Sequence, residues 1–375
     1  MSMENSIFKA PIDLKQHTCL IYAEGVFGLD AREKHSMRAK TADGILRYAG
    51  YDIAGVVDSM SQESKAGDVL KNYLEGKKNF DTPIFQSLKE AKEKTNSDVL
   101  ILGAAPEGGE LPKEWCEDIK WAIENKMHIV SGMHFALADD KEFSDISQKN
   151  GTIIWDARKI SDLSQIPVGS AEAYHVKKPI VLTVGTDAAI GKMTVAYEMH
   201  LAAKESGLKS CFIPTGQTAI MIEGWGAAVD ALPADFMAGA VEAMILSHEE
   251  GSDIFFVEGQ GSLFHPAYSN TSISLIHGAV PTHMVLVHRP QRKHSIGSKL
   301  VKLPFIKQAI HQYEESVLPE YRNAKVVAVA LNSKGLSDEE YESHKGKISA
   351  ECDLPVFDFV REKDRIKEII SKISN

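Results

Sequence analysis

The sequence predicts an α/β protein of two domains, each a mostly parallel sheet with helices on both faces. Three observations lead to this prediction. The chain has 375 residues, which is long for one domain. Short apolar runs rich in β-branched residues alternate with segments of helical spacing in both halves. Near the middle, residues 180–194 join one such run to one such helix through a glycine-containing turn.

The bulk composition narrows the class of protein. Hydrophobic residues make up 43% and charged residues 25%, as in ordinary globular proteins with a full core. The net charge of −10 comes without a basic stripe, which argues against a nucleic-acid surface. No run approaches about twenty apolar residues, and residues 1–18 do not resemble a signal peptide. We therefore expect a cytoplasmic protein without membrane contact.

Metal binding by cysteine or histidine is not expected. The four cysteines are far apart and form no C-x-x-C pair, which predicts neither a zinc site nor a disulfide framework. The histidines also lack the spacing of metal ligands.

The first half is expected to form an open, Rossmann-like parallel sheet. Its expected strands are residues 18–24, 53–58, 98–105, 128–131 and 152–155, and its expected helices are residues 41–48, 87–94 and 112–125. Residues 59–82 are polar and contain glycine, so we expect a loop there. The alternation of strand and helix indicates parallel pairing.

A dinucleotide site is not expected in this half. Gly25 and Gly28 lack the G-x-G-x-x-G spacing, and Asp58 lies too far along the chain to be a ribose-binding acid. We expect the sheet to contribute a wall of a cleft instead. Because ligands gather at the carboxyl ends of parallel strands, Gly25, Asp58, residues 103–109 and residues 131–134 are candidates by position.

The second domain is expected to begin after a linker. Residues 161–171 have few bulky side chains and contain Pro167 and Gly169. We therefore place the first domain at residues 1–170 and the second at residues 171–375. The expected strands of the second domain are residues 180–184, 209–213, 253–257, 283–288, 325–330 and 355–359. Residues 361–372 are typical of a solvated amphipathic helix.

The turn after the first of these strands predicts a phosphate-binding loop. Glycine at 185 and 191 lets backbone N–H groups turn inward, the following helix start adds partial positive charge, and Lys192 can meet the outer phosphates. The spacing is unusual, because five residues separate the glycines and Met193 stands between Lys192 and Thr194. The plainer alternative is a strand-to-helix turn without a ligand. The predicted cofactor-binding residues are Gly185, Thr186, Asp187, Ala188, Ala189, Ile190, Gly191, Lys192, Met193 and Thr194.

Glu258 is the candidate acid of the second domain. It follows an apolar strand, where phosphate-loop enzymes place a carboxylate on Mg²⁺ or on its water shell. Gly259 and Gly261 leave room for a ligand beside it. A helix-capping or salt-bridged acid is the structural alternative. If the ligand is ATP with Mg²⁺, then Thr194 and Glu258 are the predicted metal ligands.

These motifs resemble two families. Residues 185–192 (G-T-D-A-A-I-G-K) and 257–261 (V-E-G-Q-G) are similar to the loop and strand end of dethiobiotin synthetase. The Gly-Lys-Met-Thr variant and both halves together resemble a two-domain bacterial family, long of unknown function, that includes D-glutamate N-acetyltransferase. That resemblance covers nearly the whole chain and implies a Rossmann-like half followed by a P-loop NTPase-like half. It also implies a role in D-glutamate breakdown, beside a deacetylase or racemase-like partner.

The acetyltransferase resemblance implies acetyl-CoA as cofactor, with its phosphates in the loop. Acyl transfer to an amine needs a base, for which Glu258 or His265 are candidates, and donors for the oxyanion near residues 259–262. Lys192 completes the predicted catalytic set. The predicted substrate-binding residues are Thr215, Gln217, Gly259, Gln260, Gly261, Arg289 and Arg292, the arginines serving the substrate's carboxylates.

Two further functions stay open at this stage. One is an ATP- and Mg²⁺-dependent ligase or kinase of the dethiobiotin synthetase type, acting on a small carboxylate. The other is a non-catalytic nucleotide-binding protein. In each case we expect a small-molecule ligand and a homo-oligomer.

Overall fold

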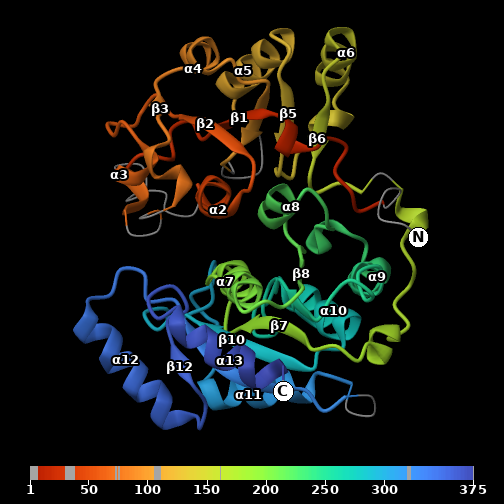
Figure 1. Cartoon of the computed structure of the whole chain (residues 1–375), viewed down its shortest axis with the longest axis vertical. Coiled ribbons are helices and arrows are strands. Elements are labelled where there is room, and N and C mark those ends of the chain that lie inside the picture. The colour runs from red at the N-terminus through yellow and green to blue at the C-terminus, as the bar shows by residue number, and fades with distance from the viewer. Residues whose placement is uncertain are drawn as a thin grey trace. The chain divides into compact units, whose positions relative to one another are not determined.

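The computed structural model describes residues 7–29, 39–71, 74, 77–104, 111–160, 162–318 and 322–374. These residues divide into two compact units, which we treat separately. The N-terminal unit contains residues 8–160 together with residues 217–228. The C-terminal unit contains residues 162–216 and 229–374. Figure 1 shows the chain coloured from red at its start to blue at its end.

The N-terminal unit is built on a six-stranded sheet in the order β3-β2-β1-β4-β5-β6, with every pairing parallel. Its strands are β1 (Thr18–Tyr22), β2 (Asp52–Val57), β3 (Ile84–Phe85), β4 (Val99–Leu102), β5 (His128–Ser131) and β6 (Ile154–Asp156). This is the strand order of Rossmann sheets, in which the direction of winding reverses between β1 and β4. The predicted Rossmann-like sheet is therefore confirmed.

The helices of this unit are α2 (Lys40–Tyr48), α3 (Ala66–Leu70), α4 (Leu88–Thr95), α5 (Lys113–Glu124), α6 (Lys141–Asn150) and α8 (Gln217–Glu223), with short 3₁₀ turns at Leu14–Gln16, Lys78–Asp81 and Leu137–Asp139. Helix α5 buries the predicted apolar stripe, which includes Trp115 and Ile119. The prediction of a loop at residues 59–82 was wrong in part, because α3 and a 3₁₀ turn lie within that range. Both are too short to produce a periodic pattern.

Helix α8 belongs to the N-terminal unit although it follows a strand of the C-terminal unit in sequence. It packs against α2, where the hydroxyls of Thr41 and Thr218 lie 3.1 Å apart. A Cβ at Gly132 would lie 2.8 Å from side-chain atoms of both Gln217 and Met221. Gly132, directly after β5, therefore permits the close approach of α8.

The C-terminal unit holds a second six-stranded parallel sheet, in the order β12-β11-β10-β7-β9-β8. Its strands are β7 (Ile180–Gly185), β8 (Ser210–Ile213), β9 (Ile254–Val257), β10 (His283–His288), β11 (Lys325–Leu331) and β12 (Val356–Phe357). Strand β7 lies between β9 and β10, at the point where the strand order reverses. The carboxyl end of β7 is therefore where a ligand is expected in such a sheet.

The helices of the C-terminal unit are α7 (Lys192–Glu205), α9 (Ala234–Leu246), α10 (Ser269–Ala279), α11 (Ile306–Glu315), α12 (Asp338–Glu351) and α13 (Asp364–Ser374), with 3₁₀ turns at Leu163–Gln165, Glu172–His175 and Val229–Ala231. Helix α13 is amphipathic, as expected: one face buries Ile366, Ile369 and Ile370 and packs against α7. In the part of the chain that the structure describes, no helix combines the length and apolar character needed to cross a membrane.

Helix α9 and helix α10 pack so closely that a methyl group does not fit between them. A Cβ at Gly278 would lie 2.3 Å from the carbonyl oxygen of Ala238. We expect Gly278→Ala to lower the free energy of unfolding by about 1 to 3 kcal/mol, since overpacking forces backbone shifts. The control is Gly346→Ala in α12, where a Cβ meets nothing within 4 Å. That change should stabilise the protein by about 0.5 to 1 kcal/mol, as alanine does in helices. Equal effects in urea unfolding would contradict this packing.

Candidate functional site

The turn between β7 and α7 combines left-handed backbone with amides that are unengaged among the described residues. Two of its residues have left-handed backbones, Ala189 with φ +52° and Gly191 with φ +107°. The backbone amides of Ala189, Ile190 and Gly191 donate no hydrogen bond to any residue that the structure describes. Successive amides in such a turn form a concavity that favours negative charge. An alanine in the left-handed region is strained by about 1 kcal/mol or more, so its surroundings must hold it there.

Contacts to the loop carbonyls hold it in this shape. Arg292 Nη1 donates to Ala188 O at 2.7 Å and Nη2 donates to Ala189 O at 3.4 Å. Asn332 Nδ2 donates to Ile190 O at 2.8 Å. In a trans peptide the C=O and the following N–H point in opposite directions. Fixing these three carbonyls therefore turns the amides of residues 189–191 toward the opposite side.

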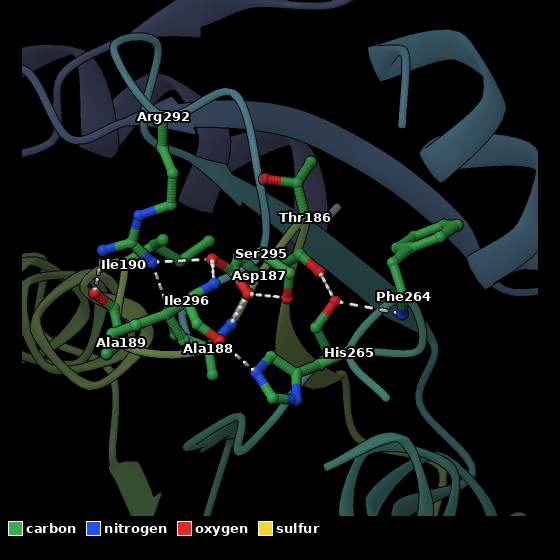
Figure 2. Close-up of polar contacts among 12 residues, drawn as sticks. Thr186, Asp187, Ala188, Ala189, Ile190, Phe264, His265, Arg292, Ser295 and Ile296 are labelled. Atoms are coloured by element: carbon green, nitrogen blue, oxygen red, sulfur yellow. Dashed lines mark hydrogen bonds and ion pairs between the residues drawn. The ribbon is translucent and has the colours of Figure 1, made fainter. Parts of the chain in front are cut away.

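Arg292 is itself held by a buried ion pair with Asp187 (Figure 2). Arg292 Nη1 donates to Asp187 Oδ2 at 2.7 Å, and the amide of Ile296 donates to the same oxygen at 2.9 Å. The other oxygen accepts from Ser295 Oγ at 2.9 Å and from the amide of Ala188 at 2.8 Å. Burial alone would raise the pKa of Asp187, but these bonds outweigh it and lower the pKa below its usual value. Asp187 is therefore a charged, fully buried anchor for the loop.

Lys192 lies at the first position of α7 and is 6% exposed. Its Nζ donates to Asp187 O at 2.9 Å, which places the ammonium at the loop. A Cβ at Gly185 or at Gly259 would lie 3.3 or 3.0 Å from Lys192 Cδ. The methylene chain of Lys192 therefore passes close to both glycines, while the atoms nearest to such a Cβ are Ile190 Cδ1 at 2.8 Å for Gly185 and Thr183 O at 1.7 Å for Gly259.

The segment after β9 is joined to the start of the loop. Tyr313 Oη and Ser262 Oγ both donate to Gly185 O, each at 2.7 Å. Tyr313 Oη in turn accepts from the amide of Leu263 at 3.1 Å, and Ser262 Oγ accepts from the amide of Phe264 at 3.2 Å. The end of β7 and residues 262–264 therefore form one hydrogen-bonded assembly.

Glu258 follows β9 and is 3% exposed. Its Oε2 accepts from the amides of Thr215 and Gly216, each at 2.9 Å. Burial raises the pKa of Glu258 to about 7, in spite of these amides and a hydrogen bond from Gln260, and the nearby charge of Asp230 adds to the rise. Glu258 can therefore gain or lose a proton near neutral pH, as a general base must.

His265 is a less suitable base than the sequence alone indicates. Its Nδ1 accepts from the amide of Ala267 at 3.1 Å. Its Nε2 lies 3.0 Å from Ile296 O and must carry the proton of that hydrogen bond. The ring also stacks on Tyr268 with 4.5 Å between centroids. Because both nitrogens are engaged, His265 could accept a proton only after losing its bond to Ala267.

The structure does not bring all of the predicted substrate-binding residues together. Thr215, Gly259, Gln260 and Gly261 lie around Glu258, and the amide of Gly259 donates to Thr183 Oγ1 at 2.9 Å. Gln217 lies in the N-terminal unit, where Arg158 Nη1 donates to its Oε1 at 3.1 Å. Arg289 follows β10, and its carbonyl accepts from the amide of Arg292 at 3.0 Å.

In the N-terminal unit, Asp58 stabilises the backbone of the turn that follows β1. It is fully buried and accepts from the amides of Gly25 at 3.0 Å, Phe27 at 2.7 Å and Gly28 at 3.0 Å. Both carboxylate oxygens are therefore occupied by backbone donors. Of the other candidates by position, residues 105–109 lie outside the described residues.

Several residues that shape the site were missed in the sequence. Ser295 and Ile296 contact Asp187 from more than 100 positions away, and Asn332 reaches Ile190 from 142 positions away. Tyr313 lies on α11 and had no motif to mark it. The polar residues directly after β11 could have marked Asn332 as part of the site, because the strand ends of one parallel sheet meet at the same edge.

Two family models match the chain. A C-terminal P-loop domain of unknown function, DUF1611, matches residues 167–367. A Rossmann-like domain, the N-terminal domain of unknown function of DUF1611, matches residues 63–160. The predicted P-loop NTPase-like domain is therefore confirmed as a fold. A crystal structure of a DUF1611 family protein from Anabaena variabilis is similar with a TM-score of 0.85 and 33% identity, covering 95% of this chain and 99% of that one.

Two relatives carry the name D-glutamate N-acetyltransferase. The protein from Tritonibacter scottomollicae is 32% identical over 277 residues, covering 72% of this chain and 80% of the relative. The protein from a Pseudoalteromonas species is 34% identical over 281 residues, covering 75% of this chain and 82% of the relative.

The buried ion pair yields a prediction on stability. Arg292→Ala should lower the free energy of unfolding by about 3 to 5 kcal/mol, because it leaves the charge of Asp187 buried without a partner. Adding Asp187→Asn to that variant should restore part of the lost free energy of unfolding. The interaction energy between the two substitutions should be about 0.5 to 3 kcal/mol. Urea unfolding of the two single variants and the double variant measures the coupling. Strictly additive effects would show that the pair does not act as a unit.

The raised pKa of Glu258 yields a prediction on pH. Between about pH 4.5 and pH 7 the unfolded chain ionises this group while the folded protein keeps it protonated, so folding loses stability as the pH rises. Glu258→Gln removes this penalty. The free energy of unfolding of the variant, relative to that of the native protein, should rise by at most about 3 kcal/mol between about pH 4.5 and about pH 8. A stability difference that does not change with pH would disprove the raised pKa.

Proposed function

This chain belongs to the DUF1611 family, and we propose that it is an N-acetyltransferase that moves an acetyl group from acetyl-CoA to the amine of D-glutamate. The names of two relatives support this substrate. The observation that carries the proposal is Glu258, a buried acid with a pKa of about 7 at the strand next to the phosphate loop. An amine is a nucleophile only after it loses a proton, and such an acid can remove it.

The loop is suited to the phosphates of CoA. Lys192 and the outward-turned amides of Ala189, Ile190 and Gly191 supply positive charge and hydrogen-bond donors at the N-terminus of α7. CoA carries a pyrophosphate and a 3′-phosphate, and acetyl-CoA supplies an activated acetyl thioester. These loop residues would hold the cofactor by its phosphates, with its thioester near Glu258.

Glu258 then acts as base and acid in turn. As a carboxylate it takes a proton from the ammonium group of the substrate, whose nitrogen bonds to the acetyl carbon. The C–S bond breaks, Glu258 returns its proton to the sulfur of CoA, and the second proton that the nitrogen loses on forming the amide is released to solvent. The amides of Gln260 and Gly261, which donate no hydrogen bond to any described residue, are the assigned donors for the negative charge on the acetyl oxygen.

The two carboxylates of glutamate need cationic partners. Of the two arginines predicted for this role, Arg292 is held by Asp187 and by two loop carbonyls. We assign the carboxylate contact to Arg289 on its position, because it follows β10 at the same edge of the sheet as the loop. Arg292 has a supporting role in this proposal.

Product analysis tests the reaction. The full-length protein with acetyl-CoA and D-glutamate should release CoA thiol and N-acetyl-D-glutamate. With ATP, Mg²⁺ and D-glutamate it should release neither ADP nor phosphate. ADP release that depends on the carboxylate substrate would favour the ligase or kinase alternative.

Glu258→Gln should lower kcat/KM by about 10² to 10⁴, because glutamine cannot accept the proton. In the native protein, kcat/KM should rise with pH through about 7 as Glu258 ionises, and the variant should lose this limb of the profile. The matched control is Glu250→Gln, at an exposed position of the same unit. Full activity in the Glu258 variant would remove Glu258 as the base.

A further inference from the structure

We infer that the loop binds the phosphates of its ligand without a divalent cation. This inference rests on the proposed function in so far as the ligand is CoA. P-loop proteins that bind ATP hold Mg²⁺ with the hydroxyl directly after the loop lysine and with an acid at a neighbouring strand end. The residues of this chain do not fit that arrangement.

The residue directly after the lysine offers no oxygen. Helix α7 begins at Lys192, so Met193 takes the second helical position and Thr194 the third. Each residue turns a helix by about 100° and advances it by about 1.5 Å. The hydroxyl of Thr194 therefore projects from a different face than a hydroxyl at position 193 would. A methionine thioether is a soft ligand, which does not suit Mg²⁺.

The acids near the loop are also poor magnesium ligands. Glu258 lies at the strand end, but its Oε2 already accepts hydrogen bonds from the amides of Thr215 and Gly216, each at 2.9 Å. Asp187 is charged, but each of its oxygens accepts two hydrogen bonds, and Arg292 balances its charge. Across the described ranges, no group of three or more histidine, cysteine, aspartate or glutamate side chains is placed to hold a metal ion.

The donors and charges at the loop suit a phosphate group that carries no bound metal ion. Lys192 and the loop amides provide donors, and Arg292 balances the charge of the buried Asp187. The pyrophosphate and monoester phosphate of CoA carry their charge in separate groups, whereas the triphosphate of ATP concentrates it and binds Mg²⁺ strongly in solution. The site should therefore favour CoA over the complex of ATP with Mg²⁺.

Isothermal titration of the full-length protein tests this inference. CoA and ATP are each titrated in EDTA and again in excess MgCl₂. We expect the Kd for CoA to agree within about twofold between the two buffers. Lys192→Ala should weaken CoA binding about tenfold or more in both buffers, which assigns the binding to the loop. The control is Lys204→Ala, an exposed lysine at the far end of α7 that should not change the Kd.

Each outcome decides the inference. CoA binding that is lost in EDTA and restored by Mg²⁺ would overturn it while leaving the acetyltransferase proposal standing. ATP binding that is equal in both buffers, with no CoA binding, would support the metal-free loop and overturn CoA as its ligand. Binding of ATP with Mg²⁺ alone would overturn both. Failure of both ligands to bind, or CoA binding that does not depend on Lys192, would also overturn the inference.

Discussion

The site depends on the hydrogen bonds that Arg292 and Asn332 make to the carbonyls of residues 188–190. In a trans peptide group the C=O and the following N–H point in opposite directions within one plane, so holding the oxygen directs the N–H away from it. The strained backbone of Ala189 persists because these contacts, and the ion pair behind them, over-determine it. The positive side of the loop is therefore held by contacts within the protein, from residues 105 and 142 positions away along the chain.

Burial has opposite consequences for the two acids of the site. Asp187 keeps its charge because an arginine and several donors surround it, which lowers its pKa. Among the described residues, Glu258 accepts from two backbone amides and a glutamine, and burial outweighs them and raises its pKa to about 7. One acid therefore organises the loop as a permanent anion, and the other is able to exchange a proton at neutral pH.

Much of the fold could be predicted from the sequence, and less of the site. Continuous apolar strands such as β7 and β9 mark a parallel sheet, and the glycines around Lys192 mark the loop. Local pattern could not show that Gln217 lies in the other unit, because a helix as short as α8 carries no signal of its packing partner. It also could not show that Arg292 is held by Asp187, since that ion pair joins residues 105 positions apart.

The orientation of the loop amides is the central claim, and amide chemical shifts test it most directly. In the full-length protein labelled with ¹⁵N, addition of CoA should shift the amide resonances of Ala189, Ile190 and Gly191 more than those of the exposed far end of α7. The amide of Ala188, which donates to Asp187 Oδ1, should move less. If CoA binds while the resonances of residues 189–191 stay unchanged, the loop does not hold the phosphates and the account is contradicted.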